Sequence, residues 1–159
     1  MGMVKTNAMR ILDSNNIEYI EHTLNIKEAE DGVTCANKLG VELERTFKTL
    51  VTKGKSGNYF VFVVPVAEKL DLKKAASSVG EKFVEMIPMK DLLKVAGYVH
   101  GGCSPIGMKK MFTTVIDETA ILFDKIIFSG GKIGFFIEVN PLEIERVLPI
   151  TFVDIVEGK

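Results

Sequence analysis

The sequence has few of the residues that build metal sites or disulfide frameworks. It contains two cysteines, Cys35 and Cys103, and two histidines, His22 and His100. The cysteines lie far apart and form no C-x-x-C pair, which argues against a disulfide framework and a structural zinc site. His100-x-x-Cys103 is a single pair of soft ligands, and a metal site would need carboxylates to complete it. We therefore expect no metal and two reduced thiols.

Long apolar runs and a strong net charge are also missing. No run approaches the roughly 20 apolar residues that cross a bilayer, and the first residues show no signal-peptide core. These absences predict a cytoplasmic protein with no membrane partner. A net charge of −1 argues weakly against binding of nucleic acid over the whole surface. Local basic patches stay open, at Lys53 and Lys55, Lys73 and Lys74, Lys109 and Lys110, and Lys132.

Three common catalytic motifs do not occur. Residues 54–56 read GKS, but a phosphate-binding P-loop would need glycine at position 49, where the chain has Thr49. The sequence has no G-x-S-x-G elbow of a serine hydrolase and no pair of carboxylates at an informative spacing. A Cys–His nucleophile pair stays open, because separation along the chain says nothing about distance in space.

The pattern of apolar residues predicts more strands than helices. At 159 residues and 47% apolar composition, we expect one domain over residues 1–159. Thr6, Asp71 and Pro88 are placed to begin helices, and Gly40 and Gly97 to end them. Strands are expected at 17–24, 47–52, 58–66, 83–87, 98–103, 113–117, 125–129, 132–139 and 151–156, and a last helix after residue 140. This order predicts an α+β fold with a mixed, largely antiparallel sheet, curled into a barrel-like core with flanking helices.

Lys48 is the most informative charged residue. It lies in FKTLV, which is otherwise typical of a buried strand. A lysine there either extends along an edge strand to solvent or places a cation in a cleft, where it could bind a phosphate, a carbonyl or a hydroxyl. The residues alone leave both alternatives open.

Two glycine-rich stretches, GGCSPIG at 101–107 and SGGKIG at 129–134, stand beside strands. Glycine lets backbone N–H groups approach a ligand closely, and successive N–H groups can form an oxyanion pocket. The simpler alternative is a connecting loop for the first stretch and a hairpin turn for the second.

Six elements occur in one order: FKTLV, PVAEKLDLKKAA, GEKFVEMIP, GYVHGGCSPIGMKK, TTVID and SGGKIG. As a set they resemble the YbaK/EbsC family of aminoacyl-tRNA deacylases, which are related to the editing domain of bacterial prolyl-tRNA synthetases. The resemblance implies hydrolysis of the ester between a mischarged amino acid and the tRNA 3′ end. The pattern is closest to family members that act on Cys-tRNA(Pro) or Cys-tRNA(Cys), and Cys-tRNA(Pro) is the expected substrate. It implies no metal or organic cofactor, the 3′ CCA end of aminoacyl-tRNA as partner, and prolyl-tRNA synthetase as a further one.

The resemblance also implies a set of site residues. Lys48 matches the family lysine that acts at the substrate 3′ end, and we expect it to be the catalytic residue. The implied substrate-binding residues are Thr49, Gly101, Gly102, Cys103, Ser104, Pro105, Gly107, Ser129, Gly130 and Gly131. Cys103 occupies the variable position of its loop. We therefore expect the N–H groups of the loop backbone, rather than the Cys103 thiol, to polarise the ester carbonyl of the substrate.

Two positions depart from the family pattern. Some members carry tyrosine where this chain has Leu24, and aspartate where it has Phe136. The departures predict a more apolar cleft. They also keep two alternatives open: a deacylase for Ala-tRNA(Pro), and a module that binds the aminoacylated 3′ end or a synthetase without cleaving anything.

Overall fold

The computed structural model describes residues 5–158, so the ends of the predicted domain, at residues 1 and 159, lie outside the described part. The helices are α1 (Asn7–Ser14), α2 (Gly32–Leu39), α3 (Leu72–Ser78) and α4 (Leu92–Ala96). Short 3-10 helices are η1 (Leu43–Arg45), η2 (Met89–Asp91), η3 (Glu118–Leu122) and η4 (Pro141–Arg146). The strands are β1 (Tyr19–Thr23), β2 (Phe47–Gly54), β3 (Tyr59–Pro65), β4 (Val84–Met86), β5 (Thr113–Asp117), β6 (Ile126–Lys132), β7 (Phe135–Val139) and β8 (Ile150–Val153).

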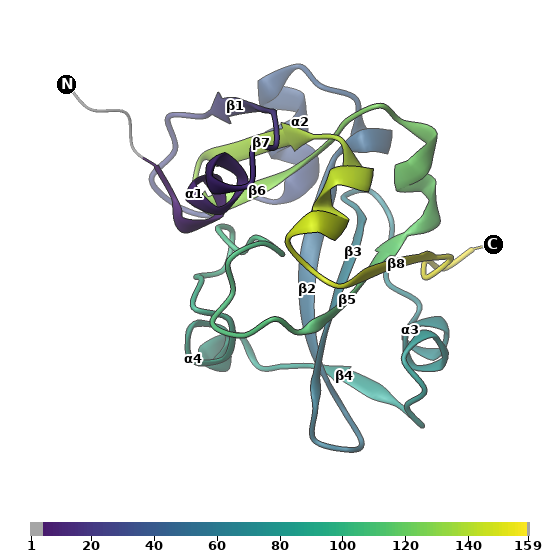
Figure 1. Ribbon diagram of the computed structural model, residues 1–159. Coiled ribbons are helices and arrows are strands. Elements are labelled where there is room, and N and C mark those ends of the chain that lie inside the picture. The colour runs from purple at the N-terminus through teal and green to yellow at the C-terminus, as the bar shows by residue number, and fades with distance from the viewer. Residues whose placement is uncertain (1–4, 159) are drawn as a thin grey trace.

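The strands form two sheets (Figure 1). A five-stranded sheet has the order β4-β2-β3-β5-β8, with antiparallel pairs at β4-β2 and β2-β3 and parallel pairs at β3-β5 and β5-β8. A three-stranded antiparallel sheet has the order β1-β7-β6. One isolated bridge, between Thr46 and Ile127, connects them. The α+β class with mixed sheets and flanking helices is confirmed, but residues 5–158 form no closed barrel.

The main core lies between the two sheets. It joins Val61 and Val63 of β3 with Phe128 of β6 and Ile137 of β7, all fully buried. Side chains alternate along a strand, so the residues between them, such as Phe62, face the opposite side of the five-stranded sheet. There they pack with α3. The two helices α3 and α4 therefore cover opposite faces of this sheet, with α4 on the side of the main core (Figure 1).

Local sequence signals account for most element boundaries. The Thr6 hydroxyl accepts the Met9 N–H, and the Asp71 carboxylate accepts the N–H groups of Lys73 and Lys74. Gly40 and Gly97 end their helices in the left-handed conformation, with φ of 73° and 86°. The hairpin between β2 and β3 forms as predicted, and β3 is a buried central strand with Pro65 at its end.

Three predicted elements differ. Residues 98–103 are not a strand: the Gly102 N–H donates to the Val99 carbonyl in a turn, and Gly101 has a φ of 84°. The helix expected over 88–97 is divided into η2 and α4, and its predicted apolar face leaves Met89 66% and Leu93 56% exposed. The last predicted helix is the 3-10 helix η4, which the Asn140 side chain caps by accepting the Leu142 N–H.

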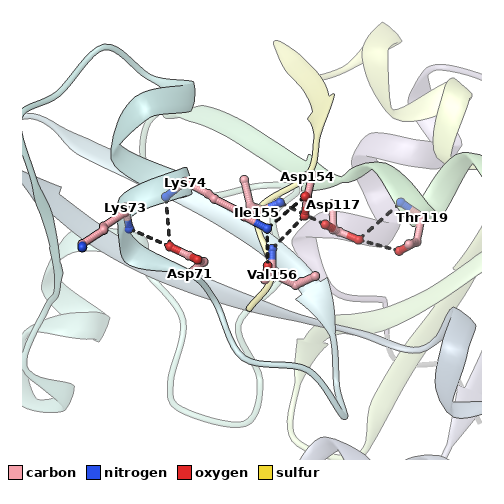
Figure 2. A network of polar contacts seen from close by, with 8 residues as sticks. All are labelled: Asp71, Lys73, Lys74, Asp117, Thr119, Asp154, Ile155 and Val156. Carbon is pink, nitrogen blue, oxygen red and sulfur yellow. Dashed lines mark hydrogen bonds and ion pairs between the residues drawn. The ribbon is translucent and has the colours of Figure 1, made fainter. Parts of the chain in front are cut away.

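The end of the chain is fixed by buried and half-buried carboxylates (Figure 2). Asp117 is the fully buried last residue of β5; its Oδ1 accepts the Ile155 N–H at 3.1 Å, and its Oδ2 accepts the Thr119 hydroxyl at 2.6 Å. Asp154 pairs with Lys74 of α3 at 2.9 Å. These contacts hold residues 154–156 against the five-stranded sheet. No helix of residues 5–158 is long and apolar enough to cross a bilayer.

Candidate functional site

A cleft of about 340 Å³ opens where the two sheets meet. The five-stranded sheet contributes residues 46–50 at the start of β2, and the three-stranded sheet contributes Ser129 and Phe136. Residues 29–33 and Cys35 form another wall, and His100, Gly101 and Cys103 complete it together with Val66 and Leu92. The cleft therefore collects segments that are far apart in the sequence. Two larger grooves of about 610 Å³ each lie around Asn16 and Lys125 and include none of the predicted site residues.

Lys48 lines this cleft, and its side chain contacts Val66, which lines the cleft as well. Its Nζ donates to the Val66 carbonyl at 3.4 Å, and it forms no ion pair with a residue of 5–158. Burial lowers the pKa of Lys48 below its ordinary value, since desolvation disfavours the charged form. The side chain is half-buried in the cleft, as in the second of the two alternatives left open by the sequence.

Thr49, the next residue along β2, carries an unsatisfied hydroxyl on the opposite face of the strand from Lys48. Its Oγ1 is buried and has no hydrogen-bond partner, which is true of no other buried side-chain polar atom in residues 5–158. A buried polar group without a partner costs about 1–3 kcal/mol. Thr49 also lines the cleft, so this unpaired hydroxyl is buried within the cleft wall.

Only part of the first glycine-rich loop, residues 101–107, lines the cleft. Gly101 and Cys103 line the cleft, whereas Gly102, Ser104 and Pro105 are buried and do not. The Gly102 N–H is already bonded to the Val99 carbonyl, and the Ile106 N–H to the Ser104 hydroxyl. Gly101 and Cys103 are therefore the loop residues whose backbone can face a ligand.

Glycine is required in this loop for close packing as well. A Cβ added at Gly101 would lie 2.4 Å from the Ala29 Cβ, and one at Gly102 would lie 3.0 Å from the Ile133 backbone nitrogen. The second contact shows that the loops 101–107 and 129–134 pack directly on each other. Gly107, with a φ of 84°, lies beside the Tyr98 hydroxyl and, with Pro105, borders a separate hollow of about 280 Å³.

In the second glycine-rich stretch, residues 129–134, again only part of the segment lines the cleft. Ser129 faces the cleft, and its Oγ accepts the Gly131 N–H at 3.3 Å. Gly130 lies behind it and accepts the Thr6 hydroxyl through its carbonyl. Gly131 adopts a φ of 105° at the irregularity in the β6–β7 pairing, which is the hairpin that the sequence predicts. Neither glycine lines the cleft.

The protein thiols are poorly suited to nucleophilic attack. Burial raises the pKa of Cys103 to about 12 and also raises the pKa of Cys35. A cysteine attacks as its thiolate, and a buried thiol with a raised pKa stays protonated near neutral pH. No group of three or more His, Cys, Asp or Glu side chains within residues 5–158 is arranged to hold a metal ion.

The sequence did not point to one wall of the cleft. Residues 29–33 are not among the predicted site residues, yet they line the cleft, with the Glu30 carboxylate paired to Lys38 and the Asp31 carboxylate bonded to Thr34. Asp31 caps α2, which begins at Gly32, and its carboxylate accepts the Thr34 N–H at 2.9 Å. The D-x-x-T capping pattern is the local signal that would have placed this turn.

A sequence model of the aminoacyl-tRNA editing domain matches residues 26–147, which include every segment of the cleft. The chain belongs to the aminoacyl-tRNA editing domain family. The family resemblance predicted from the ordered motifs is therefore confirmed, and the remaining comparisons agree with it.

One relative of this editing domain is the Enterococcus faecalis protein EbsC, named as a candidate Cys-tRNA(Pro)/Cys-tRNA(Cys) deacylase. It is 45% identical over 148 residues, which cover 92% of this chain and 88% of EbsC. The proline–tRNA ligase of Fervidobacterium nodosum is 32% identical over 134 residues, covering 82% of this chain but 22% of the ligase. A crystal structure described as a candidate trans-editing enzyme for prolyl-tRNA synthetase shares the fold, with a TM-score of 0.80, 22% identity and coverage of 98% and 100% of the two chains.

Proposed function

We propose that this protein hydrolyses the ester of mischarged aminoacyl-tRNA in trans, with Cys-tRNA(Pro) as the preferred substrate. The observation that carries the proposal is the cleft itself. Its lining includes Lys48 and Thr49 from β2, Gly101 and Cys103 from the first glycine-rich loop, and Ser129 from the second glycine-rich stretch. The similarity to EbsC over most of both chains supports the same activity.

The cleft is suited to a small, weakly polar aminoacyl group. Its volume is about 340 Å³, and Phe136 packs with Cys35 and Ile127 in an apolar cluster that Leu24 extends. Both departures from the family pattern thus lie in one apolar cluster, of which Phe136 and Cys35 line the cleft as an apolar wall. Cysteine and alanine have side chains that such a wall accepts without leaving a buried charge unpaired.

The thiol of the substrate supplies the nucleophile in this proposal. Its sulfur attacks the carbonyl carbon of its own ester, a C–S bond forms, and the ester C–O bond breaks. The thiol proton passes to the released 3′ oxygen, and water then opens the thioester ring. This route needs no protein nucleophile, in keeping with the buried, protonated Cys103.

In this proposal the protein binds the terminal nucleotide of the tRNA and polarises the ester carbonyl. Lys48 holds the terminal ribose or phosphate oxygens as a point charge. Backbone N–H groups at Gly101 and Cys103 stabilise the negative charge that develops on the carbonyl oxygen. Rejection of prolyl-tRNA follows because proline has no thiol. A prolyl-tRNA synthetase is proposed as the partner that delivers the mischarged tRNA.

Deacylation of a panel of charged tRNAs tests the proposal. Purified protein is incubated with Cys-tRNA(Pro), Ala-tRNA(Pro) and Cys-tRNA(Cys), and ester loss is followed over time. Lys48→Ala should slow hydrolysis of Cys-tRNA(Pro) by at least ~10-fold, the smaller end of losses for a positioned charge. Lys53→Ala is the matched control, because Lys53 lies on the same strand but is exposed over the Tyr59 ring.

Three results would contradict the proposal. Wild-type turnover by Lys48→Ala would remove Lys48 from the mechanism. Binding of all three tRNAs without loss of any ester would show a non-catalytic module. Faster hydrolysis of Ala-tRNA(Pro) than of Cys-tRNA(Pro) would overturn the proposed thiol route, since alanine carries no thiol.

A further inference from the structure

Positive charge is concentrated in one short part of the chain. Residues 88–111 contain four lysines, Lys90, Lys94, Lys109 and Lys110, and a single acidic residue, Asp91, which gives a net charge of +3. The whole chain carries −1, so the other 135 residues carry −4. A near-neutral protein therefore has a strongly basic segment and an acidic remainder.

The fold gathers these lysines on one surface. The Lys109 N–H donates to the Ala96 carbonyl at 3.0 Å, and the Lys109 side chain lies against Gly97 at the end of α4. Lys94 stands in the last turn of the same helix, and Lys90 lies in η2, which leads directly into it. Figure 1 shows α4 and the following loop side by side, away from α3. We call this surface, formed by residues 89–94 and 108–111, the basic face.

The four lysines are free to meet an external anion. All four are exposed, and none forms an ion pair or a side-chain hydrogen bond with another residue of 5–158. The lysines alternate with exposed apolar side chains: Met89 is 66%, Leu93 56% and Met111 72% exposed. A face of unpaired cations with apolar groups between them suits a ribose-phosphate chain, which has both charged and apolar surfaces.

The basic face continues directly into the cleft. Leu92 of α4 lines the cleft, while its neighbours Leu93 and Lys94 are exposed on the outside. His100, Gly101 and Cys103, in the loop between α4 and Lys109, line it as well. One segment thus forms a wall of the cleft on one side and the basic face on the other.

From this arrangement we propose that the basic face binds the phosphates of the tRNA acceptor arm while the 3′ end occupies the cleft. The inference rests on the proposed function only in taking tRNA as the substrate. The ester lies at the last nucleotide, so the preceding phosphates must pass the mouth of the cleft. The acidic remainder of the surface repels the same phosphates, which orients the arm along this face.

Salt-dependent binding of uncharged tRNA tests the basic face without any hydrolysis. Lys90→Gln/Lys94→Gln and Lys109→Gln/Lys110→Gln each remove two charges from it. Lys55→Gln/Lys73→Gln removes two exposed charges from the β2–β3 hairpin and from α3 and is the matched control. Two lost phosphate contacts lower the slope of log affinity against log salt by about 1.8, so the loss of affinity between about 50 and about 200 mM salt should shrink about tenfold. The control should keep the wild-type slope.

A short substrate separates this inference from the proposed function. The cysteinyl ester of adenosine reaches the cleft but carries no acceptor arm, so the basic-face variants should hydrolyse it at the wild-type rate while their KM for Cys-tRNA(Pro) rises. If the protein cleaves no ester at all, the salt dependence of tRNA binding still shows whether the basic face contacts the tRNA phosphates. Equal salt slopes for all variants and the control would overturn the inference. So would variants that lose binding to a synthetase but keep their affinity for tRNA.

Discussion

Replacement of Thr49 by valine should make the protein more stable and less active. The Thr49 Oγ1 is buried without a hydrogen-bond partner, so its removal ends a desolvation cost of about 1–3 kcal/mol. The expected gain in stability is the lower end of this range, about 1 kcal/mol. About 1 kcal/mol corresponds to a rise in Tm of about 2–4 °C for a chain of this length. Valine also has a higher β-propensity on strand β2.

Thr52 on the same strand provides the matched control. Its hydroxyl is equally buried but donates to the Phe60 carbonyl at 3.0 Å. Thr52→Val loses this bond at a cost of about 1 kcal/mol, so its Tm should fall by about 2–4 °C. The two substitutions are chemically identical and should move the thermal midpoint, measured by circular dichroism, in opposite directions.

Activity completes the test of Thr49. If its hydroxyl bonds the substrate, Thr49→Val loses about 1 kcal/mol of binding in the transition state, which is about fivefold in kcat/KM for Cys-tRNA(Pro). Thr52→Val should keep the wild-type kcat/KM below its unfolding range. A Thr49→Val protein that is destabilised like Thr52→Val and fully active would refute the reasoning, because its hydroxyl would then be a satisfied structural group.

Three other predictions concern the buried groups. Burial raises the pKa of Cys103 from 9.0 and that of Tyr98 from 10.0, each to about 12. The unfolded chain therefore loses these two protons at a lower pH than the folded protein, and the free energy of unfolding should fall as the pH rises above about 9. A Tm that stays constant from about pH 8 to about pH 11 would contradict this prediction. Cys103→Ser should keep most deacylase activity, whereas complete loss in a folded variant would indicate a protein nucleophile. Asp117→Ala leaves the Ile155 N–H unpaired and should cost about 3 kcal/mol, with faster proteolysis at residues 154–158; unchanged denaturant midpoints would count against this account of the carboxylate.

Elements with local signals could be predicted from the sequence. The caps at Thr6, Asp71 and Gly97 act within a few residues, and the hairpin between β2 and β3 depends on a short loop. The segment 98–103 could not be predicted, because its shape depends on distant contacts. The Tyr98 hydroxyl donates to the Ile106 carbonyl, and Gly102 packs on the 132–133 backbone.

The division into two sheets has the same kind of cause. Whether the two sheets join into a continuous barrel depends on pairing between residues as far apart in the sequence as Thr46 and Ile127, and only a single bridge forms there within residues 5–158. In the site, the motifs led to Lys48, Thr49, Gly101, Cys103 and Ser129, which line the cleft. The sequence could not distinguish these cleft-lining residues from Gly102, Gly130 and Gly131, which pack inside the loops, because both sets occur in the same short motifs.

The strand order of the five-stranded sheet has a consequence for how the chain folds during synthesis. Strand β5, with its buried Val115 and Ile116, pairs on one side with β3 and on the other with β8, which is made from residues 150–153. Until β8 leaves the ribosome, β5 presents an apolar strand with an unpaired edge, the kind of surface that promotes aggregation. Because β8 follows β5 in the chain, completion of the sheet waits for residues 150–153 to emerge, and nascent chains that end between Asp117 and Ile150 should aggregate more readily than the folded protein.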